Sequence, residues 1–149
     1  MKVLFLDIDG VLNSDTFYVN RPKETKQLPY PLSEFDPACV RRLNYIFEQT
    51  KARLVVSSSW RHDSFISRVL EKAGIKEKVW DITPYGMGKP RGFEIRQFLS
   101  EHQNIENYVI LDDVANMLPE QQSHFVHTKA YYGLTDEDME KAIKILNER

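Results

Sequence analysis

Several residue types and sequence features are scarce or absent in this chain, and each absence excludes a class of protein. Cys39 is the only cysteine, which excludes an internal disulfide and any zinc site built from a cysteine cluster. No apolar run approaches the length of a membrane span, and the first residues show no signal-peptide cleavage pattern. The net charge of −2 leaves no overall basic field of the kind that attracts nucleic acid. These absences predict a cytoplasmic protein with no membrane partner.

What is present is the composition of an ordinary folded domain. The 149 residues are 42% hydrophobic and 28% charged, which argues against global disorder and suits one domain with a sizeable core. No internal repeat, linker or low-complexity tract divides the chain. We therefore predict a single domain over residues 1–149. The acidic balance does not exclude a phosphate substrate, because a metal ion and a few local cations can supply positive charge.

Apolar runs alternate with stretches of helical period along the chain. Strands are predicted at residues 3–6, 54–56 and 108–111, with weaker ones at 79–82 and 125–129. Helices are predicted after Asp36, around residues 65–73 and 95–99, and after Thr135. Strands that alternate with helices predict an α/β fold, in which helices cover both faces of a parallel sheet.

One long segment, from Ser14 to Phe35, fits neither pattern. It contains three prolines and has no clean helical or strand period. At this length it is too long for a simple connection, and such loops are usually functional or disordered. We predict an irregular flap at about residues 14–35.

Each clear strand ends in polar residues of a particular kind. The three groups are Asp7 with Asp9, Ser57 with Ser58, and Asp112 with Asp113. In parallel sheets, ligands bind beyond the carboxyl ends of the strands, so these groups are expected to converge on one edge. Gly10, directly after the first pair, permits a tight turn or a close backbone approach to a ligand. This convergence is the strongest functional indication in the sequence.

Carboxylates and a hydroxyl without histidine or cysteine suit a hard cation such as Mg²⁺, which prefers oxygen ligands. A carboxylate beside Mg²⁺ can attack phosphorus and form an aspartyl phosphate. A second carboxylate two residues away can protonate the leaving oxygen and later deprotonate a water. The serines at 57–59 lack a nucleophile elbow, so a hydroxyl that hydrogen-bonds a phosphate oxygen is favoured over a nucleophilic serine.

A loop rich in glycine, residues 86–92, carries the candidate cation of the site. Lys89 lies among two glycines and a proline, which suggests a turn that aims the side chain, and Arg91 competes for the same role. The loop lacks the full pattern of a P-loop. Trp60 and Arg61 follow the serines and leave two interpretations open: a base-stacking ring with a phosphate clamp, or a core ring with a surface charge.

The ordered motifs resemble the haloacid dehalogenase (HAD) superfamily. These motifs are Asp-x-Asp-Gly-Val after the first strand, Ser after the second, a Lys in a loop, and Asp-Asp after a later strand. The resemblance implies a three-layer Rossmann-like fold with a minimal cap. An acid at Asp9 marks phosphatases and phosphotransferases within the superfamily, whereas dehalogenases lack it.

The resemblance also implies a role for each matching residue. Asp7 would be the nucleophile and Asp9 the general acid and base. Ser57 would bind phosphate and Lys89 would stabilise charge, with Arg91 as the alternative. The implied Mg²⁺ site comprises Asp7, the main-chain carbonyl of Asp9, and Asp113, with Asp112 sharing or replacing Asp113. Gly10, Ser58, Arg61 and Arg91 are the further candidates for substrate binding.

The closest similarity is to small HAD phosphatases, some of which are fused to RNA-repair enzymes. It is carried by Asp-Gly-Val-Leu-Asn, Ser-Ser-Ser-Trp-Arg and Tyr-Gly-Leu-Thr. The flap is too short for a separate cap domain, and an open site admits bulky substrates. The expected activity is Mg²⁺-dependent phosphomonoester hydrolysis of a small molecule, a nucleotide or a nucleic-acid end. The alternative is an inactive module for phosphate binding or signalling; a receiver domain is disfavoured because its acidic residues follow the strands in another order.

Overall fold

Apart from two short helices in the predicted flap, strands and helices follow one another along the chain in the order that the sequence predicts. The computed structural model describes residues 1–62, 65–86 and 88–148, and for residues 61 and 62 the backbone alone. The strands are β1 (Lys2–Leu6), β2 (Arg53–Val56), β3 (Val79–Ile82), β4 (Asn107–Asp112) and β5 (Phe125–His127). The α-helices are α1 (Asp15–Asn20), α2 (Lys23–Lys26), α3 (Pro37–Thr50), α4 (Ile66–Ala73), α5 (Arg91–Glu101) and α6 (Asp136–Asn147). Two 3₁₀ helices are η1 (Ser59–His62) and η2 (Pro119–His124).

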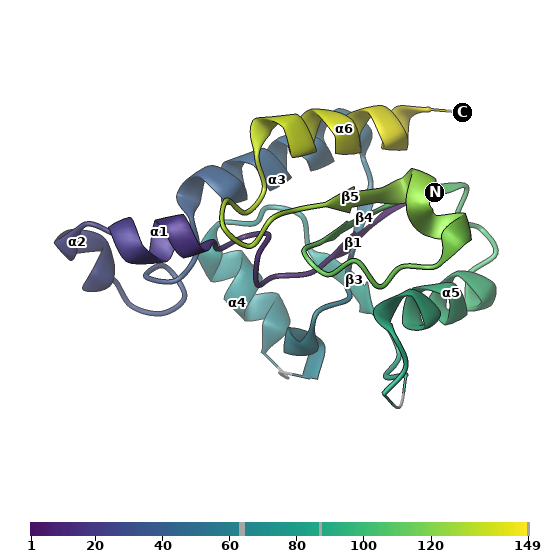
Figure 1. Cartoon of the computed structure of the whole chain (residues 1–149), viewed down its shortest axis with the longest axis horizontal. Helices are drawn as coiled ribbons and strands as arrows, with labels where there is room; N and C mark the ends of the chain where they lie inside the picture. Colours follow the sequence, from purple (N-terminus) through teal and green to yellow (C-terminus); the bar gives the residue numbers. More distant parts are fainter. Residues whose placement is uncertain (63–64, 87, 149) are drawn as a thin grey trace.

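The five strands form one parallel sheet in the order β3-β2-β1-β4-β5 (Figure 1). Strand β1 is central, and its last residue, Leu6, pairs with Val56 of β2 and with Leu111 of β4. This register brings the carboxyl ends of the three strands level. The predicted α/β fold, a Rossmann-like parallel sheet with helices on both faces, is therefore confirmed.

Both faces of the sheet are buried, which explains why β1 reads as a continuous apolar run. Leu4 and Leu6 pack into the larger core with side chains of α3, α4 and α6, whereas Val3 and Phe5 pack into the smaller core with α5. All four are completely buried, and each contributes about 1.5–3 kcal/mol to folding. Helix α3 and helix α6 lie side by side over the first face (Figure 1).

Capping residues set bounds of three helices. The Asp36 side chain accepts a 2.9 Å hydrogen bond from the Ala38 amide at the start of α3. Thr135 and Asp138 form a capping box at the start of α6. Gly74 ends α4 with a φ of 102°, a conformation that glycine adopts without strain. Among the helices that the structure describes, none has the length and apolarity to cross a membrane.

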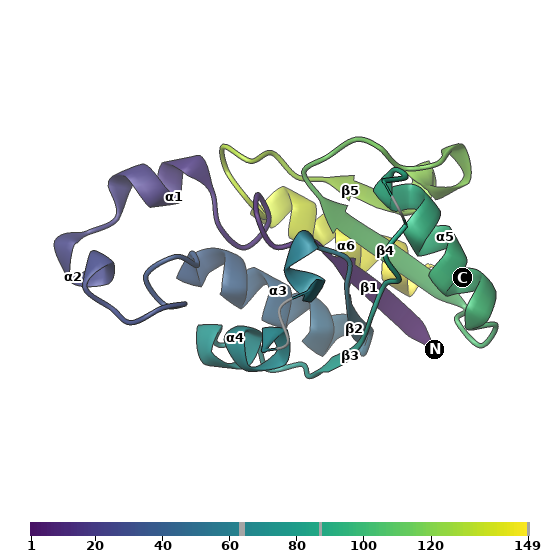
Figure 2. The same cartoon turned by 90° about the horizontal axis from the view of Figure 1, so that it is seen from below.

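The flap, residues 14–35, is more ordered than its sequence predicts. It contains α1 and α2 and projects from one end of the molecule (Figures 1 and 2). The Ser14 hydroxyl caps α1, and Arg21 donates hydrogen bonds to the carbonyls of Tyr18 and Ser33, at 3.1 and 2.7 Å. The prediction of an irregular segment is wrong here because α1 and α2 bury no residues, so neither carries an apolar period.

Candidate active site

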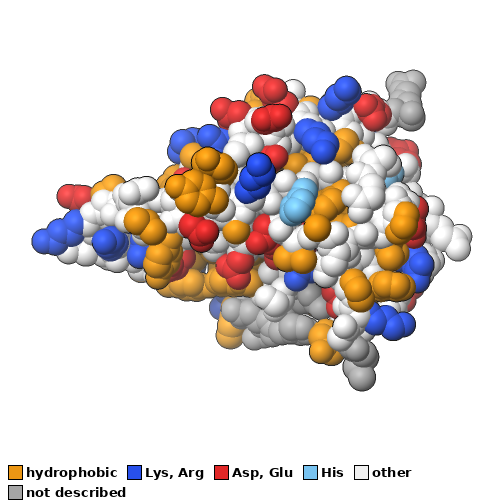
Figure 3. Space-filling model, in the orientation of Figure 1, with side chains coloured by type: hydrophobic (Ala, Val, Ile, Leu, Met, Phe, Trp, Pro, Cys, Tyr) orange, Lys and Arg blue, Asp and Glu red, His pale blue; other side chains and the backbone are white. Residues whose placement is uncertain are grey.

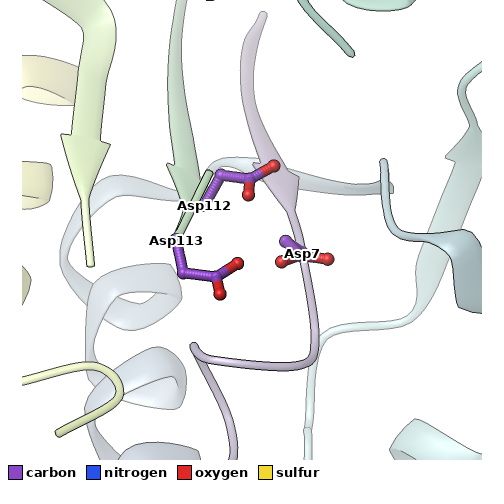
Figure 4. A group of neighbouring side chains, drawn as sticks. All are labelled: Asp7, Asp112 and Asp113. Atoms are coloured by element: carbon purple, nitrogen blue, oxygen red, sulfur yellow. The ribbon is translucent and has the colours of Figure 1, made fainter. Parts of the chain in front are cut away.

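Three carboxyl groups meet at the carboxyl edge of the sheet (Figure 4). One oxygen of each of Asp7, Asp112 and Asp113 lies within 4.8 Å of the others. Asp7 directly follows β1, and its amide donates a 3.0 Å hydrogen bond to the carbonyl of Leu111 in β4. The pairing of β1 with β4 thus places acids that are about a hundred residues apart beside one another. The structure brings together the first and last acidic groups that the sequence singled out.

The environment of these acids disfavours their negative charge. Asp7 is only 5% exposed, and burial, reinforced by the charge of Asp112 and a hydrogen bond with Asp113, raises its pKa from 3.8 to about 8. Burial also raises the pKa of Asp112, which is completely buried, although Arg91 opposes that shift. Clustered buried acids are costly without a cation, and this cost favours a site that binds one.

Arg91 supplies positive charge to this cluster from the first residue of α5. Its Nη1 lies 2.6 Å from Asp112 Oδ2 and 3.3 Å from Asp7 Oδ1. The following residue, Gly92, presses against the chain before η2, where an added Cβ would lie 2.9 Å from the Leu118 amide nitrogen and 2.7 Å from Gln121 Oε1. This close packing fixes the start of α5 and therefore the position from which the guanidinium reaches the acids.

Lys89, the other candidate cation, lies elsewhere. Its side chain is exposed, and its Nζ lies 5.7 Å from the ring centroid of Phe93. It forms no ion pair with any acid in the described part of the chain. Of the two cations in the glycine-rich loop, the structure therefore brings Arg91 to the carboxylates.

Gly10 closes the turn that carries both motif acids. Its φ is +81°, and an added Cβ would lie 2.5 Å from Asp113 Oδ2. Its amide donates to Asn13 Oδ1 at 2.9 Å, and its carbonyl accepts from Thr128 Oγ1 at 2.9 Å. The predicted tight turn is present, and the group that approaches Gly10 closely is Asp113. Its predicted approach to a ligand stays a prediction.

Asp9 lies in an environment unlike that of Asp7. Its side chain is exposed, yet each oxygen accepts a hydrogen bond: Oδ2 from Trp60 Nε1 and Oδ1 from Asn13 Nδ2, both at 3.0 Å. Trp60 is half-buried, stacks on Tyr30 of the flap with ring centroids 6.1 Å apart, and packs against the larger core. Asp9 is therefore held by neutral donors at the side of the site that faces the flap.

The serine group lies at the end of β2, beside the acids. Ser57 is completely buried, and its amide donates to the carbonyl of Leu6 at 2.9 Å. Ser58 is also buried, and its hydroxyl accepts a hydrogen bond from the Trp60 amide at 3.2 Å, so it caps η1. The side chain of Arg61, a predicted substrate-binding group, lies outside the described residues.

Two polar residues of the site, Asn13 and Thr128, escaped the sequence prediction. Asn13 falls within the Asp-Gly-Val-Leu-Asn motif, so its place four residues after Asp9 was an available signal. Thr128 follows β5, whose hydrogen-bonded neighbour is β4, and only the sheet order shows that its hydroxyl reaches the turn at Gly10.

Comparison with known protein families gives a match. The model of the family described as "HAD domain in Swiss Army Knife RNA repair proteins" matches residues 3–139. Comparisons with curated proteins and with solved structures gave no match. The matched range includes every residue of the site described above.

Proposed function

The chain belongs to the family of HAD domains in Swiss Army Knife RNA repair proteins, and on that premise we propose that it is a Mg²⁺-dependent phosphomonoester hydrolase. The observation that carries the proposal is the cluster of Asp7, Asp112 and Asp113, in which Asp7 and Asp112 pair with the guanidinium of Arg91. A nucleophilic carboxylate needs nearby positive charge to approach a phosphate dianion, and Arg91 together with a cation bound by the acids would provide it. We further propose that residues 1–149 act as one domain, with the flap as its minimal cap.

The donor set of the cluster fits Mg²⁺, because all of its members are carboxylate oxygens. Asp7 and Asp113 would hold the ion together with the main-chain carbonyl of Asp9, and Asp112 would contribute through its second oxygen or through Arg91. When bound, the ion would neutralise charge on the phosphoryl oxygens. The raised pKa of Asp7 supports this assignment, since a nearby cation would restore its ionised form.

The chain's own residues then account for two steps. The ionised Asp7 attacks phosphorus, the bond from phosphorus to the ester oxygen breaks, and Asp9 transfers its proton to that oxygen. In the second step Asp9 takes a proton from a water whose oxygen attacks phosphorus, and the bond to Asp7 breaks. Inorganic phosphate leaves and both acids return to their initial states.

Charge and orientation of the phosphoryl group come from the neighbouring residues. We assign charge stabilisation to Arg91 rather than Lys89, because Arg91 lies 3.3 Å from Asp7. Ser57 and Ser58 lie at the end of β2, at the same edge of the sheet, and their hydroxyls would donate to phosphoryl oxygens. Gly10, whose amide already donates to Asn13, would shape the turn beside them.

We propose a phosphorylated nucleotide or nucleic-acid end as the substrate class. The family description, which names RNA repair proteins, supports it. The flap supports it as well, because Lys23 and Lys26 and the rings of Tyr18 and Tyr30 are all exposed there. Figure 3 shows basic and hydrophobic side chains on the surface of this projecting end of the molecule. Such a surface combines stacking rings with positive charge, as single-stranded nucleic-acid sites do.

Turnover of p-nitrophenyl phosphate and of 3′- and 5′-phosphorylated oligonucleotides, with Mg²⁺ and with EDTA, tests the proposal. We expect activity with Mg²⁺ only, its loss in Asp7→Asn, and its retention in Asp81→Asn, a matched control on β3. Wild-type protein that hydrolyses none of these esters would contradict the proposal and favour the phosphate-binding module.

A further inference from the structure

Asp9 is exposed but is not free to rotate. Trp60 Nε1 donates to one of its oxygens and Asn13 Nδ2 donates to the other. The amide of Asn13 cannot turn to accept instead, because its Oδ1 already receives the Gly10 amide proton. An indole N–H is a donor only. Both partners therefore hold Asp9 in one orientation and leave a single lone pair on each oxygen for proton exchange with a substrate.

Trp60 is itself fixed from three sides. The Ser58 hydroxyl accepts a hydrogen bond from its amide, and its ring lies almost parallel to Tyr30, with an interplanar angle of 8°. Phe35 contacts it edge-on, with ring centroids 5.9 Å apart. Tyr30 and Phe35 both belong to the flap. The indole thus connects the flap to Asp9 through one hydrogen bond.

We infer that Trp60 is a positioning residue, which rests on the proposed function of Asp9 as the general acid. Its indole N–H aims the carboxyl group at the ester oxygen, and the flap keeps the indole in place. The effect on catalysis depends on the leaving group. An alkoxide needs the proton from Asp9 as it departs, whereas p-nitrophenolate leaves readily without one.

The variant Trp60→Phe separates this role from packing, since it keeps an aromatic ring and removes the N–H. We expect kcat for glycerol 2-phosphate to fall about 10- to 100-fold, and kcat for p-nitrophenyl phosphate to fall less than about threefold. KM should change little for either ester. Trp80→Phe is the matched control, because Trp80 packs against Phe98 and His102 on the other face of the sheet.

A second variant keeps the test valid if Trp60→Phe does not fold. Tyr30 is 51% exposed, so Tyr30→Leu removes the stacking without disturbing the core. We expect a smaller effect in the same direction: the ratio of kcat for glycerol 2-phosphate to kcat for p-nitrophenyl phosphate should fall about threefold. Equal losses with both esters, or unchanged ratios, would overturn the role of Trp60. Wild-type inactivity with both esters would instead overturn the proposed function, and this inference with it.

Discussion

The site has two halves that are built in different ways. The sheet half comprises Asp7, Asp112, Asp113 and Arg91, and the flap half comprises Asp9, Asn13, Trp60 and Tyr30. Strand register and ion pairs hold the first, whose acids are largely buried. Neutral N–H donors and ring stacking hold the second, in which Asp9 and Tyr30 are exposed. Two acids that are two residues apart in the chain thus meet opposite surroundings.

This difference matches what the proposed chemistry asks of each acid. The nucleophile, Asp7, works beside positive charge, and burial strengthens every electrostatic interaction there. The general acid, Asp9, has to meet an ester oxygen that arrives from solvent, and a directed hydrogen bond suits that task better than burial. The sheet half therefore depends on the charges around Asp7, whereas the flap half depends on the orientation of the Asp9 carboxyl group.

The largest test breaks the sheet half at its cation. Arg91→Met leaves Asp7 and Asp112 buried without their partner, which we expect to destabilise the metal-free chain by about 3–5 kcal/mol. Phosphatase activity should fall at least about 100-fold. Urea unfolding and steady-state assays measure the two effects. Lys89→Met is the matched control, and an equal loss of activity in that variant would return the role to Lys89.

The second test acts where the halves meet, at Gly10. An alanine at this position would have a strained φ of +81°, and its Cβ would collide with Asp113. We expect Gly10→Ala to lower the free energy of unfolding by about 2–4 kcal/mol and to weaken the binding of Mg²⁺. Gly88→Ala has a similar φ, +82°, with nothing within 4 Å of the added Cβ. Thermal unfolding with and without Mg²⁺ should therefore separate the collision from the backbone strain. Equal losses in the two variants would contradict the close approach.

The third test concerns pH and the sheet half alone. Because burial raises the pKa of Asp7 from 3.8 to about 8, the folded metal-free chain keeps a proton that the unfolded chain releases. The stabilisation of the folded chain by the protonated Asp7 is complete below about pH 4, and it is lost as the pH rises toward 8. We expect the free energy of unfolding to fall by more than about 1.4 kcal/mol between these limits, the equivalent of one pKa unit.

Urea unfolding in EDTA at several pH values measures this slope. Asp7→Asn should flatten it, since the variant has no proton to release there. A wild-type stability that rises over the same range would contradict the assignment.

The smallest test removes one donor from the flap half. Asn13→Ala frees Asp9 Oδ1 and leaves the Gly10 amide unpaired, which should cost about 0.5–1.5 kcal/mol. We expect kcat to fall about tenfold and the sheet half to keep its affinity for Mg²⁺. Calorimetric titration with Mg²⁺ beside steady-state kinetics measures both. A large loss of Mg²⁺ affinity would show that the halves are not independent.

The sequence predicts the sheet half better than the flap half, and the reason is physical. A continuous apolar run such as residues 3–6 predicts a buried strand. Because parallel strands end at one edge of the sheet, Asp7 is then expected near Asp112 and Asp113. The choice between Lys89 and Arg91 depends on the contact of Gly92 with residues 117 and 118, which no local pattern encodes.

The flap half depends on contacts between segments that are distant in the chain. The sequence leaves Trp60 between a stacking role and a core role, because its hydrogen bond to Asp9 spans 51 residues. Helices α1 and α2 bury nothing, so no apolar stripe reveals them. Prediction succeeds where burial produces a pattern of apolar residues along the sequence. It fails where the role of a residue depends on one contact with a distant part of the chain.

The stacked pair of Trp60 and Tyr30 gives the protein a built-in optical reporter. The chain has two tryptophans, and the other, Trp80, lies in the smaller core. A Trp80→Phe variant would carry one indole fluorophore, hydrogen-bonded to Asp9 and covered by the flap. Its emission would follow ligand arrival and flap displacement in real time, without any attached dye.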